Sequence, residues 1–263
     1  MASRNQPHVV LCGGLDPSGH AGLAADLHAC FALGGHGLPV VAARTAQSAT
    51  EWHAGWPSPP GELQTTLRFA VRGVAVGAIK TGMLGTVVNL QTVAQWARSL
   101  AVPLVVDPLH RSSSGGSLWP GERDVLVRNA LLLDLLPTAA VVTPNWLELA
   151  WLANAAPAQD VAELASQVRK LPCPALVKGG HAPGALLGTD WVWDRRTLVQ
   201  LPPRSQWRCG AGTDPVEAAP RGTGCRLATA VAIGLGKGLT LEQAAEQAVL
   251  WLDSWARLVA SPA

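Results

Sequence analysis

The sequence contains no tyrosine, only two phenylalanines, and charged residues at only 14% of its 263 positions. Without a phenol, no mechanism in which tyrosine donates a proton is available. The formal net charge of +2 predicts no basic surface for nucleic acid. The eleven tryptophans are scattered rather than interleaved with basic residues, which argues against a groove for single-stranded nucleic acid. We therefore expect no nucleic-acid partner.

Paired cysteines, paired histidines and long apolar runs are also missing. The five cysteines include no CxxC pair and the seven histidines no HxH or HExxH pattern, so neither a disulfide framework nor a zinc site is predicted. The apolar run after the polar N-terminus is too short for a secretion signal. Asp134 and Pro137 interrupt the richest apolar stretch, so no segment reaches the ~20 residues of a membrane span. We expect a cytoplasmic protein with no membrane partner.

Short apolar runs alternate with longer segments of helical periodicity. Strands that are apolar throughout are typical of a parallel sheet covered on both faces. The alternation predicts an α/β fold: a doubly wound, mostly parallel sheet with helices on both faces, in a single domain over residues 1–263. Strands are predicted over 8–12, 39–43, 74–79, 103–106, 139–142 and 175–177, with a β pair over 191–193 and 198–201. Helices are predicted over 21–33, 61–71, 86–100, 122–136, 145–153, 161–171, 223–235 and 241–258.

Glycine or polar residues follow nearly every predicted strand. In a doubly wound sheet, ligands bind beyond the carboxyl ends of the strands, so these groups should share one rim. In chain order they are residues 13–19, Gln47, residues 80–83, Asp107 with Pro108, residues 143–145 and residues 178–180.

Gly222, Thr223, Gly224 and Cys225 open a predicted helix that continues in small, apolar residues. Glycines let backbone amides converge on an anion, and a helix N-terminus adds the positive end of its dipole. The alternative is a glycine-rich helix start with Cys225 as a small filler, and the spacing alone leaves both open. In the first turn beside Arg226, the Cys225 thiol has a lowered expected pKa, which would make it a partly ionised group.

Three more segments at this rim contain a charged side chain. Lys178 is either a cation for a polyphosphate or a solvated loop lysine, and taken alone it favours the solvated reading. Asn145 and Glu148 have the spacing of a helix capping box, and Glu148 is also a carboxylate suited to magnesium; the two readings are compatible. Asp107 is either a turn residue before proline or a carboxylate of a magnesium–phosphate site.

Two residues are candidates for contact with a flat ring, and a third, Asp16, begins a turn. Gln47 carries a donor and an acceptor side by side and could read the edge of an aminopyrimidine, or it is an exposed loop residue. Met83 could pack on a planar ring, although methionine more often fills a core. Asp16 opens an ordinary turn into a helix.

Seven motifs, in order along the chain, resemble those of the hydroxymethylpyrimidine/phosphomethylpyrimidine kinases of thiamine biosynthesis, in the ribokinase-like superfamily. The resemblance covers about residues 8–252, and the ordered set is far more specific than any one motif. The motifs are GGLDPSGHAGLAADL (13–27), Ala46-Gln47 with Thr50, IKTGMLG (79–85), VVDP (105–108), VTPNWLE (142–148), LVKGGH (176–181) and GTGC (222–225).

The resemblance implies a ribokinase-like fold and ATP-dependent phosphorylation of 4-amino-5-hydroxymethyl-2-methylpyrimidine, then of its monophosphate, to the diphosphate. ATP would be the co-substrate and Mg²⁺ the cofactor, and we expect a homodimer. Substrate binding is implied for Gly13, Asp16, Gln47 and Met83, and a catalytic anion hole for Gly222, Thr223, Gly224 and Cys225. Contact with the ATP phosphates is implied for Lys178, Asp107 and Asn145, and magnesium binding for Asp107 and Glu148. Other superfamily members carry an aspartate base at the position of Cys225, so this chain resembles the pyrimidine-kinase branch.

The chain departs from the family pattern at three places. His20 stands where glycine is usual, which would alter the loop over the pyrimidine. Arg221 replaces the common histidine before GTGC and would add a phosphate contact. Residues 204–220 look longer than the family segment and suggest either a lid over the site or a paralogue with altered activity. A pyridoxal (vitamin B6) kinase and a non-catalytic pyrimidine-binding paralogue are therefore the alternatives.

Overall fold

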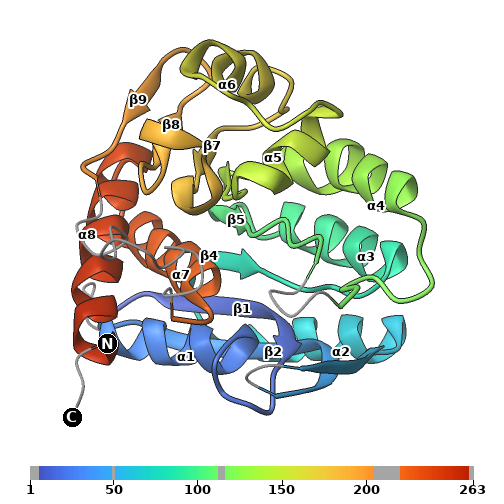
Figure 1. Ribbon diagram of the computed structural model, residues 1–263. Helices are drawn as coiled ribbons and strands as arrows, with labels where there is room; N and C mark the ends of the chain where they lie inside the picture. The colour runs from blue at the N-terminus through green and yellow to red at the C-terminus, as the bar shows by residue number, and fades with distance from the viewer. Residues whose placement is uncertain (1–5, 49–50, 112–115, 204–219, 261–263) are drawn as a thin grey trace.

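One nine-stranded sheet organises the computed structural model, which describes residues 6–48, 51–111, 116–203 and 220–260. Its strands are β1 His8–Leu15, β2 His36–Gln47, β3 Trp52–Pro57, β4 Val76–Thr81, β5 Leu104–Val106, β6 Val141–Val142, β7 Ala175–Val177, β8 Trp191–Trp193 and β9 Leu198–Gln200. Their order is β3-β2-β1-β4-β5-β6-β7-β8-β9 (Figure 1). The six strands from β2 to β7 run parallel, whereas β3 at one edge and β8 and β9 at the other are antiparallel.

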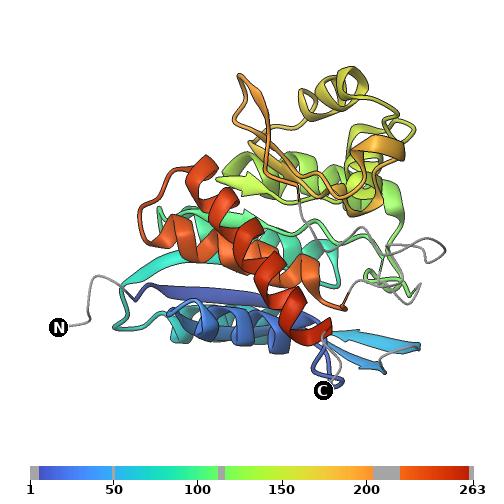
Figure 2. The ribbon, with the colours of Figure 1, turned by 60° about the vertical axis from the view of Figure 1, so that its left-hand side comes forward.

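Helices cover both faces of this sheet. They are α1 Gly22–Ala32, α2 Pro60–Ala70, α3 Val87–Arg98, α4 Asp124–Ala130, α5 Trp146–Ala153, α6 Val161–Val168, α7 Thr223–Gly236 and α8 Leu241–Ala260. Helices α2 to α6 share one hydrophobic core with the sheet, and α1, α7 and α8 share a second core on the opposite face. Figure 2 shows α7 and α8 lying together across that second face.

Strand β1 shows why a two-faced sheet needs continuous apolar runs. Val10 and Cys12 belong to the first core, while Val9 and Leu11 belong to the second, and all four are fully buried. Because successive side chains of a strand point to opposite faces, both alternating sets must be apolar. The predicted doubly wound, mostly parallel sheet with helices on both faces is confirmed.

Some predicted strands ended too early. β1 continues to Leu15, β2 runs to Gln47, and β4 includes Thr81, so residues expected after these strands form their last pairs. Gly13, for example, pairs with Val41 of β2. Glycine ended the predicted strand on propensity, but pairing with a parallel neighbour extends it.

Two local predictions were wrong. The edge strand β3 was not predicted, because its sequence WHAGWP contains no apolar run and pairs only because β2 lies beside it. The predicted helix over 122–136 is α4 followed by a π-helical stretch, Leu131–Leu135, and a short 3₁₀ turn, Leu136–Thr138. Pro137 in that last turn lacks the amide that would continue an α-helix.

Within the described ranges, no helix combines the length and apolarity that crossing a membrane requires. The assignment of residues 1–263 to a single domain stays a prediction.

Candidate active site

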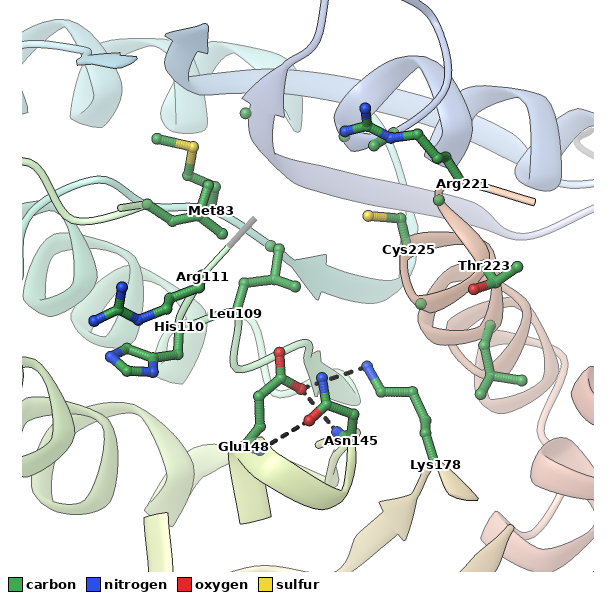
Figure 3. Close-up of a pocket in the computed structure, with 18 of the residues that line it drawn as sticks. Met83, Leu109, His110, Arg111, Asn145, Glu148, Lys178, Arg221, Thr223 and Cys225 are labelled. Carbon is green, nitrogen blue, oxygen red and sulfur yellow. Dashed lines mark hydrogen bonds and ion pairs between the residues drawn. The ribbon is translucent and has the colours of Figure 1, made fainter. Parts of the chain in front are cut away.

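A cavity of about 490 Å³ opens beyond the carboxyl ends of the central strands (Figure 3). This is where doubly wound sheets bind ligands. The expected site residues that line it are Gly13, Asp16, Gln47, Met83, Asn145, Glu148, Lys178, Gly222, Thr223, Gly224 and Cys225. Asp107 lies beneath the cavity wall, 1% exposed, and is joined to it by Lys178. The sheet therefore gathers all of these positions at one rim.

Lys178 sits between two buried carboxylates. Its Nζ atom donates a hydrogen bond to Asp107 Oδ1 at 2.8 Å and lies 3.7 Å from Glu148 Oε2. Figure 3 shows Lys178 and Glu148 pointing toward each other across the cavity wall. Lys178 is 7% exposed, so the reading as a solvated loop lysine is wrong.

The carboxylates set the protonation of this cluster. Burial acts to lower the pKa of Lys178, but the adjoining charges of Asp107 and Glu148 more than offset it and raise that pKa, so Lys178 keeps its proton. Burial raises the pKa of Glu148 to about 7, with Lys178 lowering it and Asp107 raising it. The cluster is an ionised lysine held by carboxylates in a desolvated wall.

The start of α5 aims Glu148. Asn145 Oδ1 accepts hydrogen bonds from the amides of Leu147 at 3.0 Å and Glu148 at 2.8 Å. In return, the backbone amide of Asn145 donates a hydrogen bond to Glu148 Oε2 at 2.7 Å. The predicted capping box is thus confirmed, and it holds the Glu148 side chain against the cavity rather than in solvent.

The GTGC segment forms the N-terminus of α7. Gly222 has φ +76°, and a Cβ atom there would overlap the carbonyl oxygen of His20, so only glycine fits. A Cβ on Gly224 would lie 3.3 Å from Lys178 Nζ and 3.9 Å from Asp107 Oδ2. The backbone of this helix start therefore lies directly against the charged cluster, where its dipole favours an anion.

Arg226 holds that helix start in place. Its Nη1 atom donates to the carbonyl oxygens of His20 at 2.9 Å and Arg221 at 3.1 Å. Its guanidinium also lies over the Trp255 ring of α8, 4.3 Å from the centroid. Arg226 thereby ties the loop after β1, the GTGC segment and α8 together.

The prediction of a lowered pKa for Cys225 was wrong. Burial raises the pKa of this thiol to about 11, the Lys80 ammonium offsets only part of that, and the Asp26 and Asp107 carboxylates act with burial. The prediction used the helix N-terminus and Arg226, which are close to Cys225 in the sequence. The thiol is instead desolvated by elements that are far away in the sequence and pack around it. Cys225 is a protonated thiol in the wall of the cavity at neutral pH.

We expect iodoacetamide to label Cys225 at pH 7.5 about 100-fold more slowly than an ordinary exposed thiol, because the thiolate is the nucleophile. The rate should rise about tenfold per pH unit between 7 and 10, since each unit increases the thiolate fraction tenfold. Mass spectrometry of the peptide that contains Cys225 measures the labelling rate. Free cysteine is the reference thiol, and Cys225→Ala gives the background labelling of the other cysteines. A rate that levels off near pH 7 would show that the pKa is low after all.

The ring-binding candidates come from β1, β2 and the segment after β4, and Figure 3 shows Met83 across the cavity from Cys225. Gln47 Nε2 donates to Thr45 Oγ1 at 3.2 Å, which fixes the amide within β2. A Cβ on Gly14 would lie 3.1 Å from Met83 Sδ, so the glycines of β1 let Met83 approach the strand. The Asp16 carboxylate binds its own loop: it accepts hydrogen bonds from the backbone amides of Ser18 at 2.9 Å and Ala21 at 3.0 Å.

The structure describes two of the three places where the chain departs from the family pattern, His20 and Arg221. Arg221 lines the cavity, and its Nη1 atom donates to the carbonyl oxygen of Ser48 at 2.9 Å, tying the GTGC segment to the end of β2. The His20 carbonyl accepts from Arg226, as above. Residues 204–219 lie outside the described residues, so the lid expectation stays a prediction.

Sequence reasoning gave no role to several residues that line the cavity, above all Asp26 and Trp52, and it placed Lys80 at the rim without a partner. Lys80 Nζ lies 2.8 Å from both carboxylate oxygens of Asp26, and Thr229 Oγ1 donates to Asp26 Oδ1 at 2.9 Å. Both charged side chains are only 1% exposed. The signal was present in the sequence, because a lysine inside an otherwise apolar strand needs a buried partner.

The chain is similar to proteins of known activity in sequence and in fold. The hydroxymethylpyrimidine/phosphomethylpyrimidine kinase of Streptomyces coelicolor is 35% identical over 92% of this chain and 86% of that protein. The protein of the same description from Rhizobium meliloti is 36% identical over 92% of this chain and 87% of that protein. The solved pyridoxal kinase of Staphylococcus aureus, in complex with AMP-PCP and pyridoxal, has a TM-score of 0.78 at 26% identity, over 96% of this chain and 88% of that one.

The family model extends across both the ring-binding side and the charged side of the cavity. That model, described as phosphomethylpyrimidine kinase, matches residues 16–260, which include Gln47, Lys178 and the GTGC segment. The ribokinase-like form of the sheet is confirmed by the likeness to solved kinases. The chain belongs to the phosphomethylpyrimidine kinase family.

Proposed function

We propose that this protein transfers phosphate from ATP to 4-amino-5-hydroxymethyl-2-methylpyrimidine and then to its monophosphate, a step of thiamine biosynthesis. The observation that carries the proposal is the contact between the GTGC helix start and the Asp107–Lys178–Glu148 cluster in one cavity with Gln47. Its support is the family, together with the two relatives named as kinases of this pyrimidine.

The residues divide the work between the two ends of the cavity. At one end, the backbone amides of Gly222, Thr223 and Gly224 and the ammonium of Lys178 hold the transferring phosphoryl group. At the other end, Gln47 orients the ring so that its hydroxymethyl group faces that phosphoryl group. Phosphoryl transfer depends mainly on such positioning and on charge stabilisation. Because its pKa is raised, Cys225 lines the cavity as a protonated thiol and not as a thiolate.

The charged cluster also suits Mg²⁺. Asp107 Oδ2 is buried and accepts no hydrogen bond from the described part of the chain, and Glu148 supplies a second carboxylate. No set of three or more His, Cys, Asp or Glu side chains able to hold a metal occurs in the described ranges. Magnesium is commonly held by one or two carboxylates together with substrate phosphates, so Asp107 and Glu148 would hold it only with ATP. When bound, the ion would neutralise charge on the phosphates.

A pyridoxal kinase is the second candidate, because the solved Staphylococcus aureus relative carries pyridoxal in its complex. A non-catalytic pyrimidine-binding paralogue is less well supported, since the charged cluster is complete and buried. A homodimer located in the cytoplasm stays a prediction.

An ATP-consumption assay tests the proposal, with the hydroxymethylpyrimidine, its monophosphate and pyridoxal each supplied as acceptor, with and without Mg²⁺. We expect Mg²⁺-dependent turnover of both pyrimidines and slower turnover of pyridoxal. Turnover of pyridoxal alone would show that the protein is a pyridoxal kinase. Binding of the pyrimidine without any turnover would contradict a kinase.

A further inference from the structure

Trp52 occupies a place in the cavity that none of the assigned roles uses. It is the one aromatic residue of the Trp, Phe and Tyr types that lines the cavity in the described part of the chain. Its ring also packs on the larger hydrophobic core, so it is anchored on one side. The cavity wall therefore contains one indole, at the start of the edge strand β3.

A bulge in β3 decides which way Trp52 faces. Ala46 of β2 pairs with Ala54, but Gln47 pairs with Trp52, so His53 is an extra residue in β3. If β3 had no bulge, Gln47 would pair with His53, and Trp52 would lie on the other face of the sheet, because strand side chains alternate. The bulge places Trp52 beside Gln47, as a directly opposed cross-strand pair on one face.

Two glycines from different segments make room for the indole. A Cβ on Gly55 would lie 3.1 Å from Trp52 Cζ2 and 3.2 Å from Met83 Cε. A Cβ on Gly116, in the loop after β5, would overlap the pyrrole part of the ring. Side chains at these positions would crowd or overlap the ring, so both glycines leave it room.

We propose that Trp52 is the ring-stacking wall of the acceptor site, packing on the face of the flat heteroaromatic substrate whose edge Gln47 binds. The inference rests on the proposed function and adds to it a determinant of substrate class. Stacking suits the site because its energy comes from the ring face, which every planar heteroaromatic ring offers. An acyclic or sugar alcohol offers no such face and would lose this contact.

Kinetics of Trp52→Leu and Trp52→Phe test the proposal, with Trp56→Leu as control. Trp56 lies on the same strand but is 51% exposed and does not line the cavity. We expect Trp52→Leu to raise KM for the aminopyrimidine about 10- to 100-fold with little change in kcat, since the contact binds substrate and transition state alike. KM for ATP should stay within about twofold of wild type, and Trp52→Phe should keep most of the affinity. Gly55→Val should raise KM for the pyrimidine as well, because it displaces the ring.

A binding titration gives a readout that does not depend on turnover. The aminopyrimidine alone should quench part of the tryptophan fluorescence of wild type, and Trp52→Phe should abolish that quenching while calorimetry still detects binding. The inference is overturned if quenching persists in Trp52→Phe, or if KM in Trp52→Leu stays within twofold of the Trp56→Leu control. If wild type binds the pyrimidine with quenching but never phosphorylates it, the proposed function fails while the stacking role stands.

Discussion

Replacing Lys178 with methionine should lower kcat about 10²- to 10³-fold. The substitution keeps the volume and removes the only ammonium seen between Asp107 and Glu148 in the described part of the site. That ammonium also lies against the GTGC backbone near Gly224, where the proposed function places the transferring phosphoryl group. Steady-state turnover of the hydroxymethylpyrimidine at saturating ATP and Mg²⁺ measures the effect.

The control for this substitution is Lys237→Met, which removes an exposed lysine at the far end of α7 and should leave kcat unchanged. Because Lys178→Met leaves two carboxylates buried without their cation, its urea midpoint must be measured alongside kcat. If the variant is unfolded, Lys178→Met combined with Asp107→Asn removes one of the two unpaired carboxylates and should still be inactive. A folded variant with kcat within fivefold of wild type would remove Lys178 from the phosphoryl site.

Replacing Lys80 with methionine should lower the free energy of unfolding by about 3–5 kcal/mol, because it leaves the buried Asp26 carboxylate without its cation. The pair joins α1 to β4, and Thr229 of α7 donates to the same carboxylate. Burial raises the pKa of Asp26, with Lys80 and Thr229 offsetting part of that, so an unpaired Asp26 would bind a proton rather than stay charged. Urea unfolding at pH 7 measures the loss.

Rescue distinguishes an unpaired charge from lost packing. Adding Asp26→Leu to Lys80→Met should recover most of the lost stability, since a buried ion pair replaced by apolar groups is often neutral or better. The pair of Arg257 with Asp253 on α8 is the contrast, because the Arg257 side chain is 54% exposed: Arg257→Met should cost no more than about 1 kcal/mol. If the double variant is no more stable than Lys80→Met, the cost lies in packing and the ion-pair argument is wrong.

Features that depend on neighbours along the chain were predictable from the sequence. The parallel strands appear as continuous apolar runs because both faces are covered, as β1 illustrates. The capping box of Asn145 and Glu148 spans three residues, so its geometry follows from the sequence spacing. The placement of Gln47 and Lys178 at one rim follows from parallel strands sharing a carboxyl edge.

Features that depend on distant segments were not predictable in the same way. The edge strand β3 exists because β2 supplies hydrogen-bond partners, and the orientation of Trp52 depends on one extra residue in that pairing. Asp26 and Lys80 are 54 positions apart, and only the packing of α1 against β4 unites them.

The sequence by itself determined the doubly wound sheet, the rim that carries the site and the family to which the chain belongs. The tertiary structure alone decided the electrostatics of that rim. Lys178, which reads as a solvated lysine, is a buried cation between carboxylates, and Cys225, which reads as an activated thiol, has a pKa raised to about 11. The reason is physical: helix spacing and strand pattern are local, whereas desolvation is the sum over every segment that packs around a group.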